Sequence, residues 1–203
     1  MAGSERNRFR YKDWIFQPVE RDSGSYDFNC GAPEINKFFM EDFFVYEELL
    51  VTKTYELSTE EIISENLPPL GFISFCNDAA KIEKNIKEFV PRPEEKHFQS
   101  YPAVRITWLG VSQDCHRMGV GTDMLDITKL LFASAENRTG CRLITVDARN
   151  SEQAIKLYTK SGFAFTNKNN TPETNPGKPL YRMFFDLLGP WDYGPLLLKP
   201  VNR

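Results

Sequence analysis

The segment Trp108–Thr122, with the sequence WLGVSQDCHRMGVGT, constrains the fold more than any other part of the chain. An apolar run typical of a β-strand stops at Ser112, and a turn containing Gly119 and Gly121 follows. From Val120 onward, apolar residues recur every three or four positions, as in an amphipathic helix. The first backbone N–H groups of a helix lack internal partners and carry partial positive charge, and glycines allow close approach. The segment therefore predicts a strand, an anion-binding turn and a helix.

Two well-known phosphate-binding loops do not match this turn. A Walker loop would need Gly-Lys-Ser/Thr after the glycines, and a dinucleotide loop would need Gly-x-Gly-x-x-Gly. Neither pattern occurs here. The two glycines alone leave a second interpretation open, in which a tight turn leads into an ordinary helix.

A strand–helix–strand pattern follows and favours the first interpretation. Arg142–Ala148 is rich in β-branched and aliphatic residues, which is typical of a buried strand. Asn150 or Ser151 is placed to cap a helix, and Gly162 is placed to end it. Phe163–Phe165 then begins another strand. This order of elements predicts an α/β sheet that contains parallel neighbours.

Residues 102–165 resemble the acetyl-CoA-binding half of the GCN5-related N-acetyltransferase (GNAT) superfamily. The family's turn reads Gln/Arg-x-x-Gly-x-Gly/Ala, and here it is His116-Arg-Met-Gly-Val-Gly121, so the first position differs. The family's second motif, Ala-Ile-x-Leu-Tyr-x-Lys-x-Gly-Phe, is complete in Ala154–Phe163. The resemblance implies an α/β (α+β) fold, with a mixed, mostly antiparallel sheet, a parallel and splayed central pair, and flanking helices.

The resemblance also implies a single domain over residues 1–203 that uses acetyl-CoA. About 12–100 would form the acceptor side, 101–165 the acetyl-CoA-binding core, and 166–203 a loop, the last strand and a tail. Backbone groups of β-strand residues would hold the pantetheine arm, and amides of the turn would hold the pyrophosphate. The expected cofactor-binding residues are Leu109, Gly110, Val111, His116, Arg117, Met118, Gly119, Val120, Gly121, Thr122, Asn150 and Ser151.

Tyr158 is the expected catalytic residue. The resemblance places it beside the thioester sulfur, where its phenol could protonate or hydrogen-bond the departing thiolate. The other interpretation of Tyr158 is a core aromatic residue at helical spacing. The complete motif around it favours the catalytic role.

Composition limits the class of protein. Hydrophobic residues make up 41% of the chain and charged residues 26%, which is typical of a soluble globular protein. No apolar run reaches the roughly 18 residues of a membrane span, and the N-terminus lacks the apolar core of a signal peptide. The 4 cysteines are widely spaced and there are 2 histidines, so we expect no metal site and a cytoplasmic location with reduced thiols.

The N-terminal half carries the expected acceptor side. Pro33 suits the first turn of a helix whose apolar face contains Ile35, Phe38, Phe39 and Phe43. The other expected elements are strands at Trp14–Val19, Val51–Leu57 and Leu70–Phe75, a loop or short helix at Ser58–Pro69, and a surface insertion at Ala80–Gln99.

Phe28–Phe39 resembles the Phe-x-Cys-Gly-x-x-x-Leu-x-x-Phe-Leu opening of one GNAT branch. That branch includes bacterial toxins that acetylate the α-amino group of aminoacyl-tRNA. Two features argue against a tRNA substrate. The net charge is −3, whereas nucleic-acid binders usually present a basic face. Trp108 also stands where the branch often has arginine.

The sequence favours a primary amine of a small molecule or peptide as the acceptor. The strand expected at Tyr101–Val111 contains no Asp or Glu that could act as a base, which favours an amine of low pKa. The alternative source of a base is a water chain or an acid from Glu34, Glu41 or Asp42. An acidic run from Glu41 to Glu65 is either an ordinary solvated face or a surface that attracts a cationic amine. The alternatives are charged tRNA as substrate, a catalytically silent CoA-binding module, or an unrelated phosphate-binding protein. The tail from Gly189 is expected to pack on the domain or on a second subunit, as in a homodimer.

Overall fold

The computed structural model describes residues 8–20, 27–81, 100–134, 137, 139–189 and 199–200, and its chain divides into two compact units. The first unit holds the described residues up to Cys76, those from Thr107 to Leu131, and the last strand. The second holds those from Asn77 to Ile106 and from Phe132 to Gly189. The expected insertion and the expected tail fall mainly outside the described residues.

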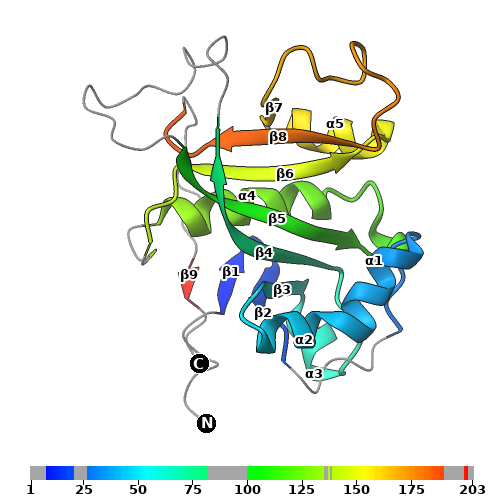
Figure 1. Cartoon of the computed structure of the whole chain (residues 1–203). Helices are drawn as coiled ribbons and strands as arrows, with labels where there is room; N and C mark the ends of the chain where they lie inside the picture. The colour runs from blue at the N-terminus through cyan, green and yellow to red at the C-terminus, as the bar shows by residue number, and fades with distance from the viewer. Residues whose placement is uncertain are drawn as a thin grey trace. The chain divides into compact units, whose positions relative to one another are not determined.

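The described strands follow the order β7-β8-β6-β5-β4-β3-β2-β1-β9 in one mixed sheet (Figure 1). Their bounds are β1 Phe9–Tyr11, β2 Trp14–Pro18, β3 Lys53–Ser58, β4 Gly71–Ala80, β5 Tyr101–Val111, β6 Leu143–Arg149, β7 Ala164–Phe165, β8 Leu180–Asp186 and β9 Lys199–Pro200. β5 and β6 are parallel, and the registered pairs β1–β2, β1–β9, β2–β3, β3–β4, β6–β8 and β7–β8 are antiparallel. This confirms the expected mixed, mostly antiparallel sheet with a parallel central pair.

The helices also follow the expected order. They are α1 Pro33–Lys37, the π-helix η3 Phe38–Asp42, α2 Phe43–Glu48, α3 Glu60–Ser64, the 3₁₀-helix η5 Gln113–Cys115, α4 Val120–Ala133 and α5 Glu152–Lys160. The predicted start of α1 at a proline is confirmed, because Pro33 is its first residue. Thr59 caps α3 by accepting a hydrogen bond from the Ile62 amide, so this gap between strands is a short helix.

The first unit has helices on both faces of β4. Neighbouring residues on a strand point to opposite faces. The ring of Phe72 lies 4.3 Å from the ring of Phe39 in η3. On the other face, a Cβ added to Gly71 would lie 2.9 Å from the sulfur of Met124 in α4. The α1–η3–α2 segment and α4 therefore cover opposite faces of this strand.

An aromatic cluster forms the core under η3. It contains Phe28, Phe38, Phe39, Phe43 and Phe72, with Trp108 packed against it. The sequence predicts Phe38, Phe39 and Phe43 on one apolar face, and the structure buries all three side chains. The π-turn, closed by the Phe43 amide bonding to the Phe38 carbonyl, widens the helix locally and buries them together.

The second unit packs α5 on one face of β6 and β8, which lie side by side in Figure 1. Tyr158 of α5 makes an edge contact with Phe163, whose ring lies 5.6 Å from Phe185 of β8. Arg182 lies an odd number of residues away from Phe185, so its side chain points to the opposite face. Ion pairs fill that opposite face.

Asp78 is the centre of this ion-pair network. Its carboxylate accepts hydrogen bonds from Arg105 at 3.0 Å, from Thr145 at 2.6 Å and from Arg182. Burial alone would raise the pKa of Asp78, but the bonds from Arg105, Thr145 and the Ala79 backbone outweigh it and hold the pKa below its usual value. The ionised form is therefore the one that the fold stabilises.

We expect Asp78→Asn to lower the free energy of unfolding by about 2 kcal/mol at neutral pH. A carboxylate with a depressed folded pKa stabilises the fold above its unfolded pKa of about 3.9, and this stability is lost as the pH falls. Urea unfolding at pH 6, 4 and 3 should therefore show a flatter acid dependence in the variant. Glu152→Gln, which removes an exposed acid paired with Lys156, is the control and should change little. Equal pH dependence in wild type and Asp78→Asn would contradict this assignment.

Candidate functional site

The parallel pair of strands separates before β5 ends. Registered pairs join β5 to β6 from Ala103–Leu143 to Ile106–Val146. β5 nevertheless continues to Val111, and no registered pair with β6 extends along these described residues. The expected splay is confirmed, because the last five residues of β5 have no registered partner in β6.

The turn after β5 has the shape of an anion cradle. Gly119 has a φ of +87°, a conformation that favours glycine, and a Cβ added there would meet no heavy atom within 4 Å. α4 begins at Val120, and the first hydrogen bond at its start joins the Asp123 amide to the Gly119 carbonyl at 2.9 Å. Among the described residues, no acceptor pairs with the amides from Gly119 to Thr122. Open space beside unpaired amides at a helix N-terminus fits a phosphate group.

His116 contacts the backbone at the end of β5 in the structure. Its Nε2 lies 3.0 Å from the Val111 carbonyl oxygen, so the ring braces the turn against the end of β5. The next residue, Arg117, has a φ of +65° and is exposed, as is Met118. The side chain of His116 therefore contacts the backbone at a position where the resemblance implied a phosphate contact.

Side chains from the N-terminal part of the chain hold the first turn of α4 in place. Asp123 accepts hydrogen bonds from Lys12 Nζ at 2.5 Å and from Trp14 Nε1 at 2.8 Å. The hydrogen bond to Asp123 is the main reason that the pKa of Lys12 is raised, although burial acts against it. Lys12 thus offsets the one acidic side chain in the first turn of α4, which keeps this helix end suited to an anion.

Tyr158 lies in the second unit, on α5. Its side chain is 6% exposed and packs edge-on against Phe163. Burial raises the pKa of Tyr158 above its usual value, so its phenol stays protonated. Within the described part of the chain, its hydroxyl has no hydrogen-bond partner. A neutral phenol with an unused donor is suited to donate a hydrogen bond or a proton, and it is unsuited to act as a base.

Asn150 and Ser151, at the start of α5, make different contacts. Ser151 is the cap, because its hydroxyl accepts a hydrogen bond from the Ala154 amide at 3.2 Å. Asn150 donates its amide to the carbonyls of Pro176 and Lys178 at 2.8 and 2.9 Å. Asn150 therefore ties β6 to the loop that precedes β8.

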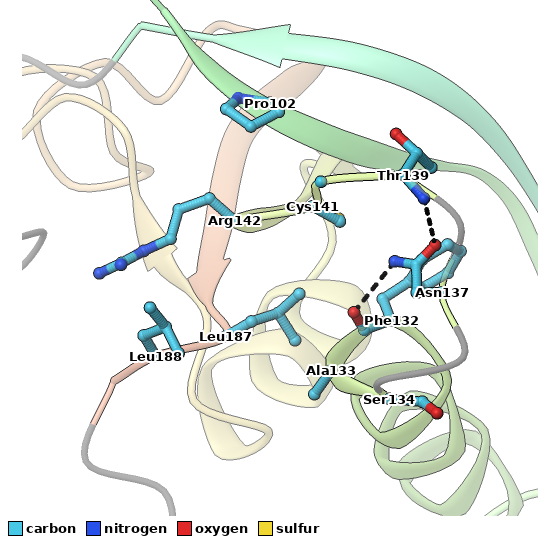
Figure 2. A pocket seen from close by; sticks show the side chains of 11 residues that line it. Pro102, Phe132, Ala133, Ser134, Asn137, Thr139, Cys141, Arg142, Leu187 and Leu188 are labelled. Atoms are coloured by element: carbon cyan, nitrogen blue, oxygen red, sulfur yellow. Dashed lines mark hydrogen bonds between the residues drawn. The ribbon is translucent and has the colours of Figure 1, made fainter. Parts of the chain in front are cut away.

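A pocket of about 410 Å³ lies in the second unit and contains none of the predicted site residues (Figure 2). Asn137 borders it, donating to the Phe132 carbonyl at 3.1 Å and accepting from the Thr139 amide at 3.4 Å. Cys141 also borders it, and burial raises the pKa of its thiol to about 11. The thiol is therefore protonated at neutral pH and is a poor nucleophile.

Several acids of the run from Glu41 to Glu65 are already paired within the protein. Glu47 accepts from the Thr54 amide at 2.6 Å and lies 3.4 Å from Lys53 Nζ. Glu56 is buried and accepts from Gln17 at 2.7 Å, and Glu60 pairs with both Arg8 and Arg10. The charge that this run offers to a ligand is therefore smaller than its composition indicates.

The described residues contain neither a metal site nor a membrane-spanning helix. No group of three or more His, Cys, Asp or Glu side chains among them could hold a metal ion. None of their helices combines the length and apolar character that crossing a membrane requires.

The chain is similar in fold to solved structures of the proteins KacT, AtaT and AtaTR. A tyrosine-to-phenylalanine mutant of KacT is 18% identical with a TM-score of 0.65, over 87% of this chain and 96% of that chain. AtaT complexed with acetyl-methionyl-tRNA is 18% identical with a TM-score of 0.65, over 86% and 95%. AtaTR bound with acetyl-CoA is 18% identical with a TM-score of 0.62, over 86% and 94%. No curated protein sequence is significantly similar to this chain.

The model of the acetyltransferase (GNAT) family matches residues 35–163, which is more than half of the chain. The matched region includes the end of β5, the cradle and α5, the elements in which the site residues were predicted. The unpaired amides of the cradle and the open space beside Gly119 fit the phosphates of acetyl-CoA. The chain thus belongs to the GNAT family and is an N-acetyltransferase that uses acetyl-CoA.

Proposed function

We propose that the enzyme transfers the acetyl group to the α-amino group of a small molecule or peptide. This proposal rests on one observation: neither β5 nor Tyr158 offers a side chain that could act as a general base. β5 contains no Asp or Glu, and the raised pKa of Tyr158 keeps its phenol protonated. An acceptor that is neutral by itself suits such a site. An α-amino group has a reference pKa of about 7.7–8.0, whereas a lysine side chain is near 10.4 and mostly charged at neutral pH.

Three groups of the predicted site then have separate tasks. Acetyl-CoA supplies the acetyl group as a thioester. The amides from Arg117 to Thr122 hold the pyrophosphate, and the backbone of Leu109 and Val111 holds the pantetheine arm. Tyr158 donates a hydrogen bond or proton to the departing sulfur, which stabilises the negative charge that develops there.

Aminoacyl-tRNA is the second candidate acceptor, because its reactive group is also an α-amino group. The resemblance of Phe28–Phe39 to the toxin branch favours it, as does the fold likeness to AtaT complexed with acetyl-methionyl-tRNA. The net charge of −3 favours the smaller acceptor, because binding of tRNA relies on neutralising several phosphates.

Salt dependence separates the two acceptors. At saturating acetyl-CoA, we expect kcat/KM for a small or peptide α-amine to fall by about twofold or less between 50 and 200 mM salt, through screening alone. For a tRNA substrate with six or more phosphate contacts, the fall would be about a thousandfold or more. Measuring the Kd of acetyl-CoA over the same salt range provides the control, because the phosphates of CoA have their own salt dependence.

Robust acetylation of charged tRNA with a steep salt slope, and no activity on free amines, would overturn the small-amine proposal. Acetyl-CoA binding without acetylation of any amine would instead favour a catalytically silent CoA-binding module.

A further inference from the structure

Asn29, Cys30 and Gly31, which precede α1, form a hydrogen-bonded network with Asn36 of α1. Asn29 Oδ1 accepts from the Gly31 amide at 2.9 Å and from Asn36 Nδ2 at 3.0 Å. Asn36 Oδ1 in turn accepts from the amide of Cys30 at 2.9 Å, with the Cys30 sulfur 3.0 Å away. This hydrogen-bond network fixes the loop between Phe28, which lies in the aromatic core, and the first turn of α1.

The network is also hydrogen-bonded to Gln113, the first residue of the turn that carries the cradle. Asn29 Nδ2 donates to Gln113 Oε1 at 3.1 Å, and the Gln113 amide donates to the Asn29 carbonyl at 2.9 Å. Gly31 lies against the same side chain. A Cβ added to Gly31, which has a φ of +82°, would lie 2.8 Å from Gln113 Nε2. Asn29 and Gln113, 84 positions apart in the sequence, are thus joined by two hydrogen bonds.

The same segment also packs on the end of β5. A Cβ added to Gly110 would lie 3.0 Å from Cγ2 of Ile35 in α1 and 2.6 Å from the ring of Phe72. The Ser112 amide, between these two contact points, donates to the Leu70 carbonyl at 2.9 Å. The backbone from Gly110 to Gln113 is therefore fixed by neighbours immediately before the turn that carries the cradle.

We propose that Asn29 and Gln113 are positioning residues for acetyl-CoA. The pair holds the start of the turn, so that the amides at its far end point toward the pyrophosphate before the ligand arrives. This inference rests on the proposed placement of the pyrophosphate at the cradle. It gives the Phe28–Phe39 segment, which was expected to serve the acceptor side, a task on the cofactor side.

The backbone of the turn explains why it needs such support. Arg117, which is not a glycine, has a positive φ of 65°. Backbone in sparsely populated regions persists only when its surroundings hold it there. A turn that is less well held would have to be ordered when acetyl-CoA binds, and this ordering would weaken the affinity.

The test measures the Kd of acetyl-CoA by calorimetry for Asn29→Ala, Gln113→Ala and the double variant. We expect each single variant to bind acetyl-CoA about 3- to 10-fold more weakly, as for the loss of one hydrogen bond. The double variant should bind no more weakly than Asn29→Ala alone, because Asn29→Ala already removes the side-chain contact with Gln113 together with the bonds to Gly31 and Asn36.

Asn137→Ala is the matched control, since Asn137 also braces a turn with two hydrogen bonds. It should lower the melting temperature without changing the Kd of acetyl-CoA. Wild-type affinity in both single variants, or losses that simply add in the double variant, would overturn the role of the pair. Gly119→Val tests the placement of the pyrophosphate separately from the role of the Asn29–Gln113 pair. If Gly119→Val leaves the Kd of acetyl-CoA unchanged, the pyrophosphate lies elsewhere.

Discussion

Tyr158→Phe should lower kcat by about ten- to a thousandfold and leave the Kd of acetyl-CoA near its wild-type value. The substitution removes only the hydroxyl, whereas the ring and its edge contact with Phe163 remain. Burial holds the pKa of Tyr158 above its usual value, so the wild-type residue carries its proton throughout the neutral range. Losing that donor would leave the charge on the departing sulfur without a partner.

Single-turnover and steady-state thiol release, with any working acceptor, would measure this effect. Tyr55→Phe is the control, because burial also raises the pKa of Tyr55 and its ring stacks on Phe16 at 4.9 Å. Its kcat should not change. If Tyr158→Phe retained wild-type turnover, Tyr158 would be only a packing residue of α5.

Gly119→Val should abolish the stabilisation of the protein by acetyl-CoA. The new side chain would project into the open space beside the unpaired amides of α4, where the pyrophosphate is proposed to lie. A ligand at one hundred times its Kd stabilises the native state by about 2.7 kcal/mol, so the predicted loss is large.

The positive φ of Gly119 requires care in the measurement. Valine is strained at +87°, so the variant should melt at a lower temperature even without ligand. The relevant quantity is therefore the difference in melting temperature with and without acetyl-CoA. Gly140→Val places the same side chain in open space elsewhere and should keep the full ligand shift. A full shift in Gly119→Val would place the pyrophosphate away from this turn.

Sequence alone predicts those parts of the fold that local signals determine. β5 was expected at Tyr101–Val111 and occupies those residues, because its apolar run ends at a turn. Ser151 was one of two expected caps of α5, and Gly162 beyond its end has the left-handed φ of 82° that a C-terminal glycine predicts. Capping and periodicity depend on residues a few positions apart, so they can be read without knowing the tertiary structure.

Contacts between distant residues could not be predicted in this way. The Asn29–Gln113 pair, the anchoring of Asp123 by Lys12 and Trp14, and the π-turn of η3 all depend on tertiary packing. β1 was not expected either, because its three residues are too few to show a periodic pattern.

Charge is the clearest example of this limit. The acids between Glu41 and Glu65 suggest an attractive surface when they are counted along the chain. Glu60, however, pairs with Arg10 in β1 and with Arg8 just before β1, and both arginines lie about 50 positions away in the sequence. A run of like charges therefore says little about the surface until its partners from other elements are known.

The most direct test of the account is acceptor-dependent thiol release from acetyl-CoA, measured across free amino acids, peptides, polyamines and charged tRNA in parallel. The account predicts release that requires an α-amino acceptor, peaks with a small molecule or peptide, and falls at least tenfold in Tyr158→Phe. Tight binding of acetyl-CoA with no release above background for any acceptor would contradict it.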